Sequence, residues 1–360
     1  MKVAILPYYV MKSALWFMLG AVVGLWLLQV LFAYLSELPD VSETYTAVDA
    51  FWYIVYRSPY FLVQFMPTGA LLGAVIGLGL LADNSELVVM RAAGVSVYRI
   101  VGWVMVPAFL FVLLSLCVNQ FVLPGSNQKA DSIISRQSQD GLVSVNGYWS
   151  VNSHDKGMDV VYVSYADSAG NLGQTKQYRL DNHANLTAAL SANTGSYDKQ
   201  QDHRYWWQLS DVYQVVIAQT VQQNHHHQQA LVLPIAPNHV HLLTKDADDL
   251  SVTDLYAHKQ LMAQQNLRSL QHELNFWQKL FSPLAILSLV LVATSFVFGS
   301  VRTYSLGLRM VVALLVGLLF SYLSDLSAFV SLATKVSPLL MTVLPIVLSA
   351  TVGMWLLTKH

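Results

Sequence analysis

Charged residues are scarce in this sequence. Asp, Glu, Lys and Arg make up 11% of the 360 residues, whereas a soluble domain carries about 25%. Together with a mean hydropathy of +0.45, this scarcity excludes an ordinary soluble protein and predicts an integral membrane protein. The net charge of −1 leaves no basic footprint, so we expect no nucleic-acid partner.

Cysteine and nucleotide-binding motifs are also missing. The single cysteine, Cys117, lies in an apolar run, which excludes a disulfide framework. No G-x-x-x-x-G-K-[ST] segment occurs, so we expect neither ATP hydrolysis by this chain nor a bound cofactor. The run His225–His227 lies among glutamines without further ligands at metal spacing, and we interpret it as a surface turn rather than a zinc site.

Six apolar runs are long enough to cross a bilayer, which takes roughly 20 residues as helix. Three runs come before a long polar segment and three come after it. Their expected bounds are Ser13–Leu35, Pro59–Leu81, Val97–Leu123, Phe276–Phe298, Leu306–Leu326 and Pro338–Leu357.

Lysine and arginine are distributed unequally between the two sides. If the spans alternate, the opposite short loops hold only Arg57 and Lys335, and the bias places both termini in the cytoplasm. The segment between the third and fourth spans then lies outside. The residues on the basic side are Lys2, Lys12, Arg91, Arg99, Arg302, Arg309 and Lys359.

The segment 124–275 alternates apolar and polar residues between expected turns such as Asn146–Gly147 and Asn193–Gly195, which is typical of half-buried strands. We therefore predict a membrane α-helical protein of six transmembrane helices with an inserted periplasmic all-β, jelly-roll-like domain. The expected division is 1–123, 124–275 and 276–360. The expected strands are Gly141–Val151, Asp159–Tyr165, Thr175–Leu180, Tyr205–Val216 and Ala230–Ile235.

Residues 83–94 lie between the second and third apolar runs and carry the signals of a short helix. They open with three N-cap residue types, place an acid in the first turn and a base near the other end, and close on glycine. The pattern predicts an amphipathic helix whose apolar residues anchor it in a soluble partner, while a plain connecting loop is the alternative. Its assigned residues are Asp83, Glu86, Leu87, Met90, Arg91 and Gly94.

Small residues recur at helical spacing in the first two runs. Gly69, Gly73 and Gly77 are four apart, which allows another helix to approach closely, and Gly20 and Gly24 repeat the spacing. We interpret both sets as packing surfaces, with lipid contact as the alternative.

Several motifs together resemble one family. The segment Gly77–Ala82, followed by Ser85–Met90 and Ala93–Gly94, is similar to the second span and coupling helix of the LptF/LptG permeases, and closer to the LptG branch. Trp277–Leu284 and Ser295–Gly299, with Arg302, match the later spans.

The resemblance implies a multi-pass subunit of a lipopolysaccharide-export ABC transporter in the bacterial inner membrane. It implies a heterodimer with an LptF-like permease, two copies of a cytoplasmic ATPase that uses the ATP, and a single-span LptC-like periplasmic partner. Lipopolysaccharide would enter laterally beside the first and fifth spans, and residues 83–94 would be the coupling helix.

One stretch departs from the family pattern. Members of the LptG branch carry lysines at the periplasmic end of the first span, whereas Phe32–Asp40 holds none and includes two acids. We therefore expect a mainly apolar lipid gate from Phe32, Tyr34 and Phe320. Lys129 and Arg136 are the candidate phosphate contacts, with simple solvation as the alternative.

Two other classes stay open on the residues alone. A secondary transporter would need paired ionisable residues at mid-membrane, and a membrane-tethered periplasmic enzyme would need an acid–base cluster in the β segment. The spans are nearly free of charge, and we see no such cluster in the β segment. Asp325 lies late in the fifth span and should face protein or water, because a carboxylate near the bilayer centre would cost about 2.5–3.5 kcal/mol; a hydrated position near the interface is the alternative.

Overall fold

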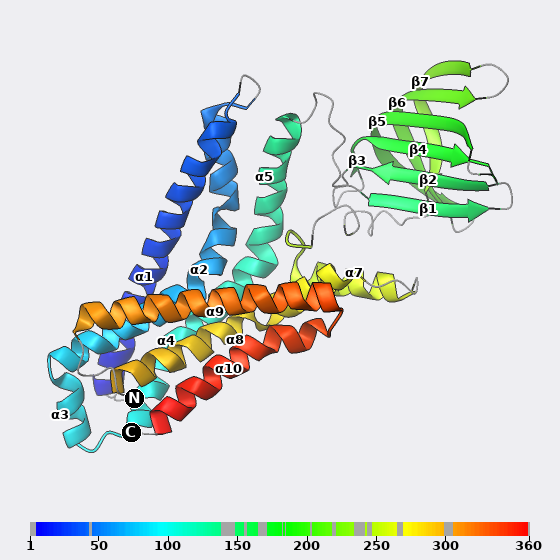
Figure 1. Cartoon of the computed structure of the whole chain (residues 1–360). Coiled ribbons are helices and arrows are strands. Elements are labelled where there is room, and N and C mark those ends of the chain that lie inside the picture. Colours follow the sequence, from blue (N-terminus) through cyan, green and yellow to red (C-terminus); the bar gives the residue numbers. More distant parts are fainter. Residues whose placement is uncertain are drawn as a thin grey trace. The chain divides into compact units, whose positions relative to one another are not determined.

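The computed structural model divides the chain into two compact units, shown in Figure 1. A helical unit comprises Met1–Gln137, Ser251–Thr253 and Leu267–His360, and a β unit comprises Ser138–Leu250 and Asp254–Asn266. The structure describes residues 5–358 except 43–44, 138–147, 155–156, 165–170, 182, 184, 202–203, 218–220, 234–241, 243–246, 265–268 and 299–304.

The helical unit confirms the six predicted spans. Within the described residues, six helices are long and apolar enough to cross a membrane. Five of them contain the whole of an expected run and extend beyond it, whereas the third ends at Cys117, six residues before the end of the expected run Val97–Leu123. The six helices are α1 (Ile5–Glu37), α2 (Ala47–Asp83), α4 (Val97–Cys117), α8 (Leu270–Phe298), α9 (Leu306–Thr334) and α10 (Pro338–Thr358).

The third span does not end where its apolar run ends. A π-helical turn, Val118–Val122, connects α4 to α5 (Leu123–Gln137), so residues that we expected to start the β segment are helical. Polar contacts with α2 hold this extension, since the Ser126 hydroxyl donates to the Tyr56 carbonyl at 2.5 Å. The apolar residues predict that a span exists, but their pattern does not predict a polar contact that extends the helix beyond it.

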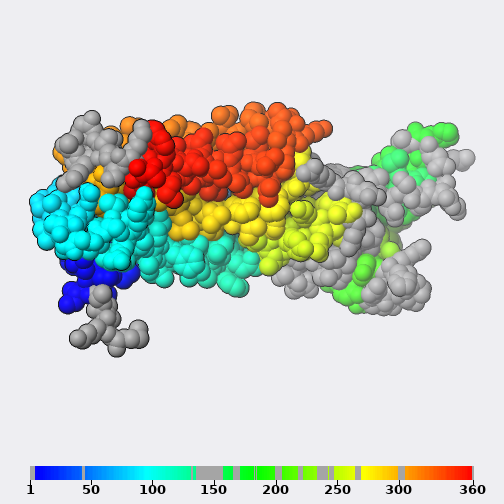
Figure 2. Space-filling view, turned by 90° about the horizontal axis from the view of Figure 1, so that it is seen from below, coloured from blue at the N-terminus to red at the C-terminus, as the bar shows by residue number. Residues whose placement is uncertain are grey.

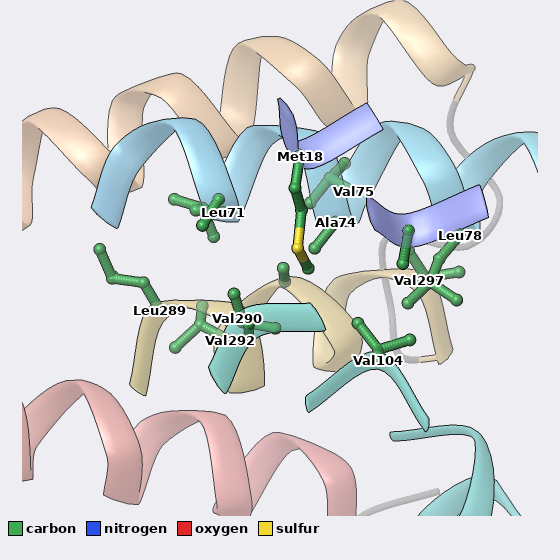
Figure 3. Packing of buried hydrophobic residues seen from close by; sticks show 14 of the residues in the cluster. Met18, Leu71, Ala74, Val75, Leu78, Val104, Leu289, Val290, Val292 and Val297 are labelled. Carbon is green, nitrogen blue, oxygen red and sulfur yellow. The ribbon is translucent and has the colours of Figure 1, made fainter. Parts of the chain in front are cut away.

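Helices α2 and α8 form the centre of the helical unit. In each, 67% of the most apolar stretch is buried, against 11% in α1 and 17% in α9. Figure 3 shows side chains from α1, α2, α4 and α8 pointing toward one another, Met18 and Leu78 among them. Most of the apolar surface of α1 and α9 is therefore not covered by the rest of this chain.

The glycines of α2 allow α1 to pack closely against it, as expected. A Cβ on Gly69 would lie 2.6 Å from the Val22 side chain, and one on Gly73 would overlap the α1 backbone at Met18. The expectation for α1 itself is wrong within this chain, because nothing lies within 4 Å of the Cβ position at Gly20 or Gly24.

The β unit is one antiparallel sheet, which confirms the all-β part of the predicted fold. The strands follow the order β1-β2-β4-β5-β6-β7, and β3 pairs with β5. A helix, α7 (Val252–Gln264), follows the sheet. The strands are β1 (Tyr148–His154), β2 (Gly157–Val163), β3 (Asn171–Leu172), β4 (Thr175–Leu180), β5 (Leu186–Gln201), β6 (Arg204–Ile217) and β7 (Val221–Leu233).

Two expectations for this sheet are wrong. The expected turn at Asn193–Gly195 lies inside β5, where the missing Cβ of Gly195 leaves room for Leu209 and Leu172. The expected turn at His225–His227 lies in β7. There His225 contacts Asp211 at 2.7 Å and stacks on Tyr213, so cross-strand partners stabilise a strand that its composition did not predict.

Candidate functional site

The segment after α2 is helical, as predicted. Helix α3 (Glu86–Ala92) ends where Gly94 adopts φ of +88°, and the Val95 amide donates to the Met90 carbonyl at 3.1 Å. Glycine suits this left-handed position because a Cβ would be strained there.

The start of α3 differs from the expectation. Helix α2 continues through Asp83, and Ser85 precedes α3 at φ of +61° without a side-chain cap. Asn84 and Ser85 form the turn between the two helices, with the Ser85 amide donating to the Ala82 carbonyl at 3.0 Å. Asp83 thus belongs to the end of α2 and does not cap α3.

The apolar anchors expected on α3 face the protein. Leu87 and Met90 pack into the core of the helical unit, with Leu87 only 4% exposed. Their neighbours Val88 and Val89 point outward, and Val89 is 66% exposed. The expectation that Leu87 and Met90 contact a partner is therefore wrong for this structure, and the free apolar surface of α3 belongs to Val88 and Val89.

Polar side chains flank that surface. Glu86 is half-buried and accepts a hydrogen bond from the Tyr9 hydroxyl of α1 at 3.3 Å, whereas Arg91 is exposed. In Figure 2 the cyan surface around α3 forms one end of the helical unit, beside the blue first turns of α1. The hydrogen bond between Tyr9 and Glu86 joins α3 to the first span, and the sequence did not predict this link.

A second contact joins the end of α2 to the fifth span. A guanidinium nitrogen of Arg309 lies 3.0 Å from the Asp83 carboxylate. The Arg309 side chain is 4% exposed and that of Asp83 is 41% exposed. On α2, Gly79 lies next to Leu306 of α9, and a Cβ there would approach the leucine side chain to 2.7 Å. The only sequence signal was an arginine placed inside an apolar run, which we counted merely as a charge on the basic side.

The expected gate residues lie on α1 and α9. Phe32 is exposed on α1, whereas Tyr34 is half-buried, donates to the Ala47 carbonyl at 3.5 Å and packs edge-to-face on Phe51. Phe320 is half-buried and packs against the core of the helical unit, so its place in the gate stays a prediction. The residue before it, Leu319, is 68% exposed.

The candidate phosphate contacts lie on α5. Lys129 is exposed and its ammonium lies 5.6 Å from the centre of the Tyr56 ring. Arg136 also belongs to α5, but its side chain is outside the part of the chain that the structure describes. Neither residue lies on α1 or α9, so their role as phosphate contacts stays a prediction.

One of the two acids that replace the expected lysines has a structural partner. The buried Tyr45 hydroxyl donates to Glu37 at 3.1 Å, which ties the end of α1 to the loop before α2. Burial, then the hydrogen bond to Glu37, raises the pKa of Tyr45, so the phenol stays protonated and keeps donating.

Comparison with known proteins gives one consistent relationship. The family model for the lipopolysaccharide export system permease LptF/LptG matches residues 8–359. The chain is 27% identical over 325 residues to the lipopolysaccharide export system permease protein LptG of Escherichia coli, covering 88% of this chain and 87% of that protein. It is 26% identical over 358 residues to the protein of the same name in Haemophilus influenzae, covering 98% of each.

The family match covers both units. Of the motifs that suggested the family, Gly299 and Arg302 lie outside the described residues. Ser85–Met90 encloses most of α3, and Trp277–Leu284 lies on α8. The chain therefore belongs to the LptF/LptG family of lipopolysaccharide export permeases.

Proposed function

We propose that this chain is the LptG-type permease subunit of an ABC transporter that extracts lipopolysaccharide or lipooligosaccharide from the inner membrane. It would pass the lipid to a periplasmic bridge of β domains that leads toward the outer membrane. The observation that carries the proposal is the family match along residues 8–359 of a chain with six membrane-spanning helices and an inserted β sheet.

The proposed partners follow from the family. An LptF-like permease would complete a heterodimer, two copies of a cytoplasmic ATPase would supply the energy, and an LptC-like single-span protein would receive the lipid. Helices α1 and α9 bury little of their apolar surface in their own chain, so another protein or lipid must cover it. These exposed surfaces support a partner in the membrane. The chain itself would have no catalytic residue and no cofactor.

We assign the contact with the ATPase to α3. Its outward face combines Val88 and Val89 with Arg91 at one end and Glu86 at the other. Apolar anchors with flanking charges suit a helix that lies in a groove, where charge-assisted contacts fix its orientation. Figure 1 places α3 at the end of the helical unit where α1 begins and α10 ends, which supports a cytoplasmic position together with the termini.

Cysteine labelling tests the proposed orientation. In a Cys117→Ala background, we expect an impermeant maleimide added to intact spheroplasts to label His226→Cys in β7 and to spare Ser305→Cys before α9. Both positions are exposed in the structure, so accessibility to solvent is matched. Labelling of Ser305→Cys after lysis is the control, and equal labelling of both before lysis would refute the six-span orientation.

Reconstitution tests the function. The chain co-expressed with its LptF-like, ATPase and LptC-like partners should purify as one complex and release lipopolysaccharide from proteoliposomes only when ATP is added. The complex carrying an ATPase variant unable to hydrolyse ATP is the control and should release none. ATP turnover by this chain purified alone, or release that persists in the control, would contradict the proposal.

A further inference from the structure

The ion pair between Asp83 and Arg309 occupies a specific place in the fold. Asp83 is the last residue of α2 and precedes the first residue of α3, Glu86, by three positions. Arg309 lies in the first turn of α9. The pair therefore joins the base of the proposed docking helix directly to the fifth span, and both residues belong to the helical unit.

The two charges do not stabilise their own helices. Asp83 places a negative charge at the C-terminal end of α2, and Arg309 places a positive charge near the N-terminal end of α9. Both positions oppose the helix dipole, which favours cations at the C-terminus and anions at the N-terminus. Each charge is offset by the other across the helix–helix contact, so the pair serves the link between the helices.

Beyond this pair, α9 contacts α2 closely at two glycines, Gly79 of α2 and Gly317 of α9. The buried residues of α9 other than Arg309 are small, and Gly317 packs so closely on Thr68 that a Cβ would lie 2.6 Å from the threonine methyl. The larger apolar residues of α9 that face the core are only partly buried, and only 17% of the apolar stretch of α9 is buried. These partly buried residues are Met310, Val312, Val316 and Phe320. Among the described residues of α9, Arg309 is thus the one large side chain that is buried, and the helix is less enclosed by the rest of the chain than α8, of whose apolar stretch 67% is buried.

We propose that Asp83 and Arg309 are a positioning pair that makes the first turn of α9 move with the base of α3. The inference rests on the proposed function, in which α3 receives motion from the ATPase and α9 borders the lipid entrance. Because Arg309 is buried and Asp83 lies three residues from Glu86 of α3, displacement of that helix reaches α9 through this ion pair. The remainder of α9, most of which is not buried in this chain, then moves with its first turn.

The first test compares lipid release with ATP hydrolysis in the complete complex. In Arg309→Met, which keeps an extended side chain at the buried position, we expect ATPase association and hydrolysis to persist while lipopolysaccharide released per ATP falls at least tenfold. Arg99→Met, at an exposed arginine on α4, is the matched control and should keep the ratio. An unchanged ratio in Arg309→Met would overturn the proposal.

The charge-swapped variant, Asp83→Arg with Arg309→Asp, separates positioning from stability. It restores the pair and places each charge at the helix end that the dipole favours, so it should be at least as stable as either single variant. We expect it to recover most of the release ratio lost in Arg309→Asp alone. Recovery of thermal stability without recovery of the ratio would mean that the pair only holds the fold together, and would overturn the proposal.

A spectroscopic measurement tests the link without lipid or partners. Nitroxide labels at Ala92 on α3 and Leu308 on α9, both exposed, should give a narrow distance distribution in the purified chain and a broader one in Arg309→Met. Equal widths would refute the link. A wild-type complex that releases no lipopolysaccharide would instead contradict the proposed function, while these distances would still decide the role of the pair.

Discussion

Val89→Asp is expected to release the ATPase subunit from the complex while leaving the permease folded. Val89 is 66% exposed on α3, so its side chain makes few contacts within the chain. If it sits in a groove of the ATPase, the substitution places an unpaired charge in an apolar contact, which is strongly unfavourable. We expect recovery of the ATPase in pull-down to fall at least tenfold and lipid release to be lost.

Leu87→Ala is the matched control two residues away. Leu87 is buried in the core of the helical unit, so truncation should cost about 2–5 kcal/mol of stability through lost burial and a cavity. Thermal unfolding in detergent should therefore shift for Leu87→Ala and stay unchanged for Val89→Asp, whereas ATPase recovery per folded permease should show the reverse. Loss of ATPase recovery in both variants by the same factor would mean that α3 has no dedicated docking face.

The sequence predicted that α3 exists but not which side of it faces outward. Its end was set by local chemistry, since Gly94 suits a left-handed residue whatever surrounds it. Its orientation could not be predicted, because Leu87, Val88, Val89 and Met90 are four consecutive apolar residues that surround the helix. Only the packing of α3 against the helical core decides which two are buried.

The same distinction holds for the rest of the fold. The six spans were predictable because long apolar runs have one stable conformation in a bilayer. The Asp83–Arg309 pair was not, because its members are 226 positions apart and meet only when α2 packs on α9. The strand β5 was missed because Asn193–Gly195 carries a turn signal locally, while pairing with β6 on one side and β3 and β4 on the other overrides it.

The two helices that border the proposed lipid entrance differ in how their aromatic residues lie. Phe32 of α1 is exposed, but Phe320 of α9 packs inward and Leu319 takes the outward position. Lipid A carries several acyl chains, and burying apolar surface is worth about 25 cal/mol per Å². An entrance lined by such residues can therefore retain lipopolysaccharide without the lysines that Phe32–Asp40 lacks.

Photocrosslinking decides whether α1 and α9 form that entrance. With benzoylphenylalanine in place of Phe32 or Leu319 in the assembled complex, we expect capture of lipopolysaccharide in intact cells, and at least threefold less capture from position 320. Leu348, exposed midway along α10, is the matched control and should contact ordinary phospholipid only. Equal capture from Leu348 would show general exposure to the membrane. The expectation depends on the outward apolar faces of α1 and α9. Capture confined to the β unit would therefore place the entrance away from these two helices.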